Sequence, residues 1–394
     1  MPPATVLISD PQAALSRHTF IDQFFALRQA SLSLFDSVSP AAFCHQAHPD
    51  FSPVGWHLGH IGWTEGLWLL PKSLREQLTP PDYNALFAAS GLPKTARSQL
   101  PPLQEICTYL ATIRAAILTA WVKQDFQAQE WLAWWLLQHE AQHGETIQMI
   151  LALQAPNPLS TTVIPVNKQI TAMVTIPAGV LKPSAPSLLL LDNEKPGLAE
   201  EIPAFQIDQQ PVSRGQFQYF IESGGYETEQ WWTAEGWAWR KQYQINQPRY
   251  WAWPVSSDHP VCGVSWYEAA AYAAFMGKQL PTEHQWERAQ QVLQAPPRSE
   301  IPLATPRDHY TSSLSTSSYG FGQVWEWTDT WFHPYPGFCS SPYPGYSAAY
   351  FDRAHRVLKG QSFASQPLTQ RPSFRNWYHP HTQEIFAGIR CVRT

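Results

Sequence analysis

Two histidines four residues apart are the clearest candidates for chemistry in this chain. His139 and His143 lie in the stretch LQHEAQHGET, residues 137–146. On an α-helix, residues four apart project from the same face one turn apart, which lets two imidazoles share one metal ion. The apolar residues before His139 favour a buried position. A surface pair or a satisfied core pair remains the alternative, because the motif is short.

Glu145 looks like a third ligand but faces the wrong way. It lies about 200° around a regular helix from His143, so it cannot complete a site of two histidines and one carboxylate. A third ligand must then come from another helix, and the segment GWHLGHIG offers His57 and His60. Helix bundles commonly build metal sites from facing helices, and three imidazoles leave coordination positions open for catalysis.

The first part of the chain has the apolar spacing of helices. The spacing predicts four helices, over residues 13–34, 56–70, 103–122 and 129–153. Four helices with connections between them suggest a bundle. The proline-rich connection at 78–102 is too long for a simple turn, so we expect it to be functional.

The pattern changes after residue 155. Residues 156–172 begin with a Pro/Ser/Thr-rich stretch that predicts a linker. Beyond it, short β-like segments alternate with Gly/Pro turns, and helices are expected near 213–222 and 266–276. The sequence therefore predicts a helical domain over 1–155 and an α+β domain with much irregular structure over 173–394.

Composition limits the classes of function. The chain has 394 residues, 44% of them hydrophobic, which is enough for two packed cores. Its net charge is -5 without a Lys/Arg cluster, so we expect no nucleic-acid partner. No apolar run is long enough for a membrane helix and the N-terminus lacks a signal pattern, so a cytoplasmic protein is expected. The five cysteines form no CxxC pair and are expected to be free thiols.

The motifs together resemble the nonheme-iron sulfoxide synthases of ergothioneine biosynthesis. That family joins a DinB-like helical bundle to a domain like the formylglycine-generating enzyme, which has a C-type-lectin-like fold. The resemblance covers nearly the whole chain. It rests on WHLGHIG and His-x-x-x-His-x-Glu in the first half, and on LDNEKP, VSWYEA, LPTE, VWEWT, RNW and FAGIR in the second.

The resemblance implies an iron(II) site and two small-molecule substrates. His60, His139 and His143 would form a facial three-histidine iron site, whereas His57 is not carried over as a ligand. With O₂ as co-substrate, the family joins a thiol to imidazole C2 of hercynine, the Nα-trimethylated histidine, and oxidises the sulfur to a sulfoxide. Three protein ligands leave room for the imidazole, the thiolate and O₂.

Residues for hercynine follow from the same resemblance. Gln142, Asn376 and Trp377 match residues that contact hercynine in the family. An indole face suits the trimethylammonium group, a cation that cannot donate hydrogen bonds. A core role for Trp377 and a buried structural charge at Arg375 are the alternatives.

Residues for the thiol are less completely matched. Lys94 and Arg97 match a pair of arginines that binds carboxylates of the sulfur donor, but lysine lacks the bidentate fork. Charges of a solvated loop are the alternative. Tyr378 stands where members that use γ-glutamylcysteine have an aspartate, which favours free cysteine or another small thiol. Tyr343 and Tyr346 lie in the region that matches the family's proton-donating tyrosine, which diverts the reaction from thiol dioxygenation. Of these two we retain Tyr343, and Tyr378 is a second candidate.

Three related reactions and one non-enzymatic role remain open at this point. An ovothiol-type synthase, a selenoneine-type synthase and a thiol dioxygenase would use the same metal site, and a non-catalytic binding protein would keep only the scaffold. Formylglycine generation is disfavoured, because its cysteine pair is not matched by Cys339 and Cys391, which lie in different motifs.

Overall fold

The computed structural model describes residues 17–123, 129–155, 164–166, 171–197, 199–293 and 320–394. The chain divides into two compact units, residues 1–156 with 187–189, and residues 157–186 with 190–394. Residues 13–16 of the first predicted helix and most of the predicted linker lie outside the described residues. Among the described residues, no helix has both the length and the apolar character needed to cross a membrane.

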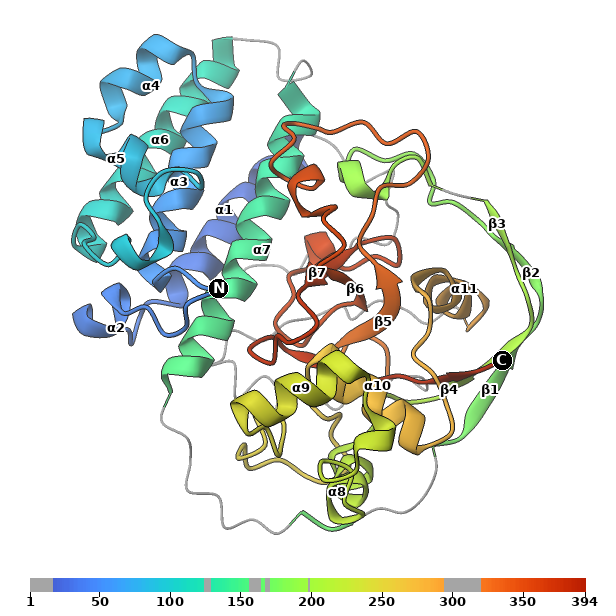
Figure 1. Cartoon of the computed structure of the whole chain (residues 1–394). Coiled ribbons are helices and arrows are strands. Elements are labelled where there is room, and N and C mark those ends of the chain that lie inside the picture. The colour runs from blue at the N-terminus through green and yellow to red at the C-terminus, as the bar shows by residue number, and fades with distance from the viewer. Residues whose placement is uncertain (1–16, 124–128, 156–163, 167–170, 198, 294–319) are drawn as a thin grey trace, which may run out of the picture. The chain divides into compact units, whose positions relative to one another are not determined.

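Unit 1 is helical, as the sequence predicts (Figure 1). Its long helices are α1 (Arg17–Ser33), α3 (Val54–Leu69), α6 (Leu103–Lys123) and α7 (Glu130–Gln154). Helix α3 contacts α5, α6 and α7, and α1 contacts α7. The connection predicted at 78–102 is partly helical. The shorter elements of the unit are α2 (Pro40–Cys44), α4 (Lys72–Leu78), α5 (Pro81–Phe87) and the 3₁₀ turn η1 (Lys94–Ala96).

A stripe of glycines lets α3 lie close to its neighbours. Gly55, Gly59, Gly62 and Gly66 recur every three or four residues, so they share one face of the helix. A Cβ at Gly59 would lie 2.2 Å from the ring of Phe87, and one at Gly62 would lie 3.0 Å from a carbon of Leu110. Glycine in a helix costs about 1 kcal/mol relative to alanine. This cost is offset here by the close approach of α5 and α6.

Each long helix of unit 1 contributes one buried charge to a single network. The members are Arg28 from α1, Glu65 from α3, Arg114 from α6 and Glu140 from α7. Arg28 lies 3.0 Å from Glu65 and 2.9 Å from Glu140, and Arg114 lies 2.6 Å from Glu65 and also pairs with Glu140. Two guanidiniums and two carboxylates balance, which a dry interior requires of buried charge.

Unit 2 is an α+β domain with short strands (Figure 1). One sheet has the order β1-β4-β9, a second pairs β2 with β3, and a third has the order β7-β6-β5-β8 with β5 and β8 parallel. The strands are β1 (Met173–Ile176), β2 (Gly179–Leu181), β3 (Glu200–Ile202), β4 (Phe205–Asp208), β5 (Trp325–Trp331), β6 (Arg356–Gly360), β7 (Asn376–Tyr378), β8 (Ala387–Gly388) and β9 (Val392–Arg393).

Two helices of unit 2 occur where the sequence predicts them. Helix α8 (Arg214–Glu222) follows Ser213 and α10 (Trp266–Phe275) follows Ser265, and both serines cap their helices through capping boxes. The prediction of only two helices was wrong, because α9 (Ala234–Tyr243) and α11 (Glu283–Leu293) are also present. Helix α9 buries only Gly236, and α11 is mostly polar and buries a narrow stripe around Trp286, so neither has many buried apolar residues to mark it in the sequence.

Candidate functional site

The three predicted metal ligands lie together inside unit 1. His60 comes from α3, and His139 and His143 come from α7. One ring nitrogen of each lies within 4.8 Å of the others, and among the described residues this is the one such group of three that could hold a metal. Glu145 is buried but is not a member of the group. The helical argument against Glu145 as a ligand agrees with this arrangement.

The spacing of the rings suits one shared ion. Nε2 of His139 and Nε2 of His143 are 3.1 Å apart. Two nitrogens at about 2.1 Å from one metal ion lie about 3.0 Å apart when the angle at the metal is about 90°, and about 3.4 Å apart at a tetrahedral angle. The observed spacing lies within this range, so both rings can share one ion, and three protein ligands would leave such an ion with open positions.

The backbone at the end of α5 holds the third imidazole. Nδ1 of His60 lies 2.6 Å from the carbonyl oxygen of Phe87, so Nδ1 carries the proton and donates it. Its Nε2 then keeps the lone pair that a metal needs. Trp56 stacks on the His60 ring with centroids 4.6 Å apart and donates from Nε1 to the carbonyl of Leu86 at 2.6 Å. The consecutive carbonyls of Leu86 and Phe87 thus hold the rings of Trp56 and His60 in place.

Burial keeps the histidines neutral. Burial lowers the pKa of His60 to about 4 and that of His57 to about 3. Burial and neighbouring histidines lower the pKa values of His139 and His143 well below the usual range. The imidazoles are therefore neutral near pH 7, so each ring keeps one nitrogen lone pair that could bind a metal.

Gln142 and the two cations predicted to bind the sulfur donor also lie in unit 1. Gln142 precedes His143 on α7 and donates from Nε2 to the Gln138 carbonyl at 3.1 Å. Lys94 donates to the carbonyl of Asp50 at 2.6 Å. Arg97 is buried, and its guanidinium lies 4.1 Å from the centre of the Trp56 ring. Arg97 thus reaches the ring that stacks on His60.

Arg97 already has protein partners. Its Nε donates to the Leu92 carbonyl at 2.9 Å, one terminal nitrogen donates to Ser52 Oγ at 2.9 Å, and the other donates to the Ala89 carbonyl at 2.7 Å. A guanidinium has five N–H groups, so each terminal nitrogen has a second hydrogen beyond these bonds. These contacts hold Arg97 in place and leave it able to donate further.

Asn376, Trp377 and Tyr378 form strand β7 of unit 2. The strand pairs with β6, where Trp377 lies opposite Val357, and all three residues are half-buried. Trp377 stacks on Phe332 with centroids 4.3 Å apart and an interplanar angle of 6°. Asn376 Oδ1 accepts from the backbone N–H of Trp377 at 3.0 Å. Trp377 is therefore held by an aromatic neighbour and keeps part of its surface exposed.

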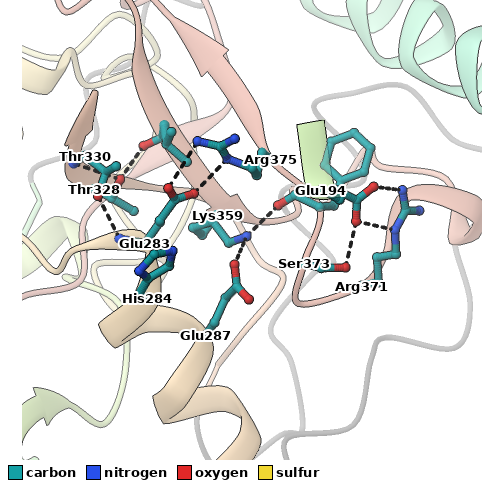
Figure 2. A network of polar contacts seen from close by, with 12 residues as sticks. Glu194, Glu283, His284, Glu287, Thr328, Thr330, Lys359, Arg371, Ser373 and Arg375 are labelled. Carbon is teal, nitrogen blue, oxygen red and sulfur yellow. Dashed lines mark hydrogen bonds and ion pairs between the residues drawn. The ribbon is translucent and has the colours of Figure 1, made fainter. Parts of the chain in front are cut away.

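Arg375 has a structural role instead. Figure 2 shows Arg375 and Glu283 joined side by side, with the Lys359–Glu287 and Arg371–Glu194 pairs nearby. Arg375 is fully buried and lies 2.8 Å and 3.1 Å from the two Glu283 oxygens. Burial alone would raise the pKa of Glu283, but Arg375 outweighs it and lowers that pKa. Within the motif RNW, Arg375 thus belongs to a core ion pair, whereas Asn376 and Trp377 belong to the half-buried strand β7.

The two candidate tyrosines lie in different elements of unit 2. Tyr343 is half-buried in the connection between β5 and β6, and burial raises the pKa of its phenol. Tyr378 ends β7 and pairs with Arg356 of β6. Tyr346 is buried and meets Trp377 edge to face, with centroids 6.1 Å apart. A raised pKa keeps the Tyr343 proton in place near pH 7, as a proton donor requires.

Sequence reasoning missed the groups that orient the ligands. Trp56, the Phe87 carbonyl and Trp135, whose ring stacks on His139 with centroids 5.3 Å apart, were not predicted to take part. Trp56 and Trp135 each stand four residues before a ligand, which places them on the ligand face of their helices. That spacing was the available signal, whereas a backbone carbonyl leaves no signal in the sequence.

The fold and the histidine site together define a class: a two-domain protein that joins a helical unit with three clustered histidines to an α+β unit. Two family models match the chain in that order. The DinB superfamily matches residues 23–147, and the sulfatase-modifying factor enzyme 1-like domain matches residues 160–296 and 302–394.

Curated relatives make the family specific. The chain is 34% identical to the hercynine oxygenase of Mycobacterium tuberculosis, over 93% of this chain and 96% of that protein. It is 32% identical to the hercynine oxygenase of Mycolicibacterium smegmatis, over 96% and 99%. It is also 30% identical to ergothioneine biosynthesis protein 1 of Schizosaccharomyces pombe, over 51% of this chain and 27% of that protein. The chain belongs to the hercynine oxygenase family and is an oxygenase.

Proposed function

We propose that the chain is an iron(II)- and O₂-dependent sulfoxide synthase of ergothioneine biosynthesis. The reaction joins imidazole C2 of hercynine to the sulfur of a small thiol and oxidises that sulfur to the sulfoxide. One O₂ is consumed: one oxygen atom enters the product, and the other leaves as water with the hydrogens of the C–H and S–H bonds. The supporting observation is the neutral group of His60 and His139, both buried, with half-buried His143, in a chain that matches hercynine oxygenases over nearly its whole length.

Each histidine has a defined part in holding the ion. His60, His139 and His143 would each offer Nε2, and their neutral state makes the lone pairs available without loss of a proton. Bound iron(II) would supply the redox chemistry that couples O₂ to formation of the C–S bond. The Phe87 carbonyl holds the proton on Nδ1 of His60 and so prevents that ring from turning its protonated nitrogen to the ion.

Hercynine would be bound by Gln142, Asn376 and Trp377. A trimethylammonium group offers no hydrogen bond, so a partly exposed indole is a suitable partner. Trp377 is held against Phe332 and therefore loses little side-chain freedom when a ligand binds. Each amide, Gln142 in unit 1 and Asn376 in unit 2, can donate and accept hydrogen bonds to polar atoms of a ligand.

The sulfur donor would be bound through its carboxylate by Lys94 and Arg97. Arg97 is already fixed by three hydrogen bonds and by Trp56, so its remaining N–H groups are pre-oriented. Tyr378 offers no carboxylate to pair with the ammonium group of γ-glutamylcysteine. We therefore propose free cysteine or another small thiol as the sulfur donor in preference to γ-glutamylcysteine. Comparison of kcat/KM for these two thiols tests this preference.

The proton donor is proposed to be Tyr343 or Tyr378. Replacing the true donor by phenylalanine should shift the products from sulfoxide toward the sulfinic acid of the thiol, because oxygen transfer to sulfur needs no phenol proton. Mass spectrometry of Tyr343→Phe and Tyr378→Phe identifies which residue acts. If neither variant changes the product ratio, both assignments are wrong.

The deciding experiment is anaerobic loading with iron(II), followed by O₂ and hercynine with cysteine or γ-glutamylcysteine. A sulfoxide with sulfur on imidazole C2 is the expected product, identified by mass spectrometry and NMR. His139→Ala should lose both iron and turnover. Iron-loaded protein that forms no sulfoxide with any thiol would refute the assignment. Sulfur on another imidazole carbon would indicate an ovothiol-type reaction, and a selenium donor would indicate a selenoneine-type one.

A further inference from the structure

His57 touches one of the three candidate ligands. It lies on α3 one turn before His60 and is only 7% exposed. Its Nδ1 is 2.8 Å from Nδ1 of His143, which is hydrogen-bond distance. His57 is not a member of the group whose ligand atoms lie within 4.8 Å of one another. It therefore contacts a ligand without sharing the centre of the site.

Only one arrangement of protons in this contact leaves His143 able to bind an ion. Two ring nitrogens at this distance bond only when one carries the proton and the other offers its lone pair. If His57 donated, neutral His143 would carry its own proton on Nε2, the nitrogen that lies 3.1 Å from Nε2 of His139. If His143 donates from Nδ1, its Nε2 keeps the lone pair on the side of His139.

We infer that His57 is a positioning residue: its Nδ1 accepts the Nδ1 proton of His143 and so holds the tautomer and ring orientation in which Nε2 of His143 faces the metal. The inference rests on the proposed function, because it requires that the three histidines hold an ion. His60 has the same arrangement with a different acceptor, the Phe87 carbonyl. Groups that accept a hydrogen bond from the second ring nitrogen of a metal-binding histidine typically change the metal affinity 10–100-fold.

Two variants of similar shape separate acceptance of the hydrogen bond from packing. In His57→Asn the amide oxygen stands two bonds beyond Cβ, as Nδ1 does, and it can accept the proton of His143. His57→Leu has nearly the same shape and no acceptor. Both are made in the full chain, with thermal unfolding of the metal-free proteins as the folding control. The affinity for cobalt(II) is measured by chelator competition, and the visible spectrum of the cobalt form is recorded.

We expect His57→Leu to bind cobalt(II) about 10–100-fold more weakly than wild type with altered visible bands, and His57→Asn to stay within about threefold with unchanged bands. Equal affinity of His57→Leu and wild type would overturn the inference, as would an equal loss in both variants. If His57→Leu does not fold, His57→Gln takes its place, because its amide reaches past the δ position and leaves Nδ1 of His143 unpaired. A folded wild-type chain that binds no metal would refute the proposed function itself.

Discussion

Glu140→Gln should destabilise unit 1 strongly, because it removes one of four balanced buried charges. Glu140 is fully buried, accepts from Arg28 Nε at 2.9 Å and also pairs with Arg114. In the variant, two guanidiniums share the single carboxylate of Glu65. Breaking a buried ion pair from one side costs about 3–5 kcal/mol. That is a large part of the roughly 5–15 kcal/mol that keeps a domain folded.

Hydrogen exchange on α1 and α7 measures this loss in unit 1 without interference from unit 2. Glu76→Gln is the matched control, because Glu76 lies on the exposed side of α4, 3.8 Å from Lys72, and should cost less than about 0.5 kcal/mol. Adding Arg28→Met to Glu140→Gln restores neutrality and should recover much of the loss. A cost below about 1 kcal/mol for Glu140→Gln, or no recovery in the double variant, would refute the reasoning.

Three further predictions concern packing, pH and binding. Gly59→Ala should destabilise the metal-free protein by about 1–3 kcal/mol in urea unfolding, because the added Cβ would lie 2.2 Å from the ring of Phe87. Gly144→Ala is the control. Its added Cβ would meet nothing within 4 Å, so it should stabilise the protein by up to about 1 kcal/mol. The pKa of Glu283 is lower in the folded protein than its ordinary value of 4.5. The ionised carboxylate therefore contributes its full stability above pH 4.5 and loses it as pH falls through the pKa of the folded state. In urea unfolding, the free energy lost in Glu283→Gln should thus become smaller below pH 4.5. Trp377→Leu should weaken hercynine binding about 10–30-fold in calorimetry, the loss of about 2 kcal/mol of cation–π attraction; an unchanged Kd would contradict the proposed role.

The helical spacing of a few residues was enough to predict part of the candidate site. His139 and His143 follow from their separation on a helix, and the same geometry excluded Glu145. His60 was not reachable by geometry alone, since His57 lies just one turn away; the family resemblance selected it. The structure distinguishes the two by their partners, because His60 binds a carbonyl and His57 binds another imidazole.

Other features depend on tertiary contacts that no local pattern encodes. A glutamate within an apolar helix, such as Glu65 or Glu140, indicates that a partner exists. It does not identify Arg28 or Arg114, which are distant in sequence. The long fold elements were predictable because their apolar faces repeat many times. Helix α9 was missed because it buries only Gly236, and α11 was missed because few of its residues are apolar.

The candidate ligands connect two helices that are far apart in the chain, with His60 on α3 and the other two on α7. A bound ion would therefore act as a reversible cross-link, closing a long loop much as a disulfide does in other proteins. The stabilisation would grow with the logarithm of free metal concentration. Resistance of unit 1 to proteolysis would then report how fully the protein is loaded, before any substrate is added.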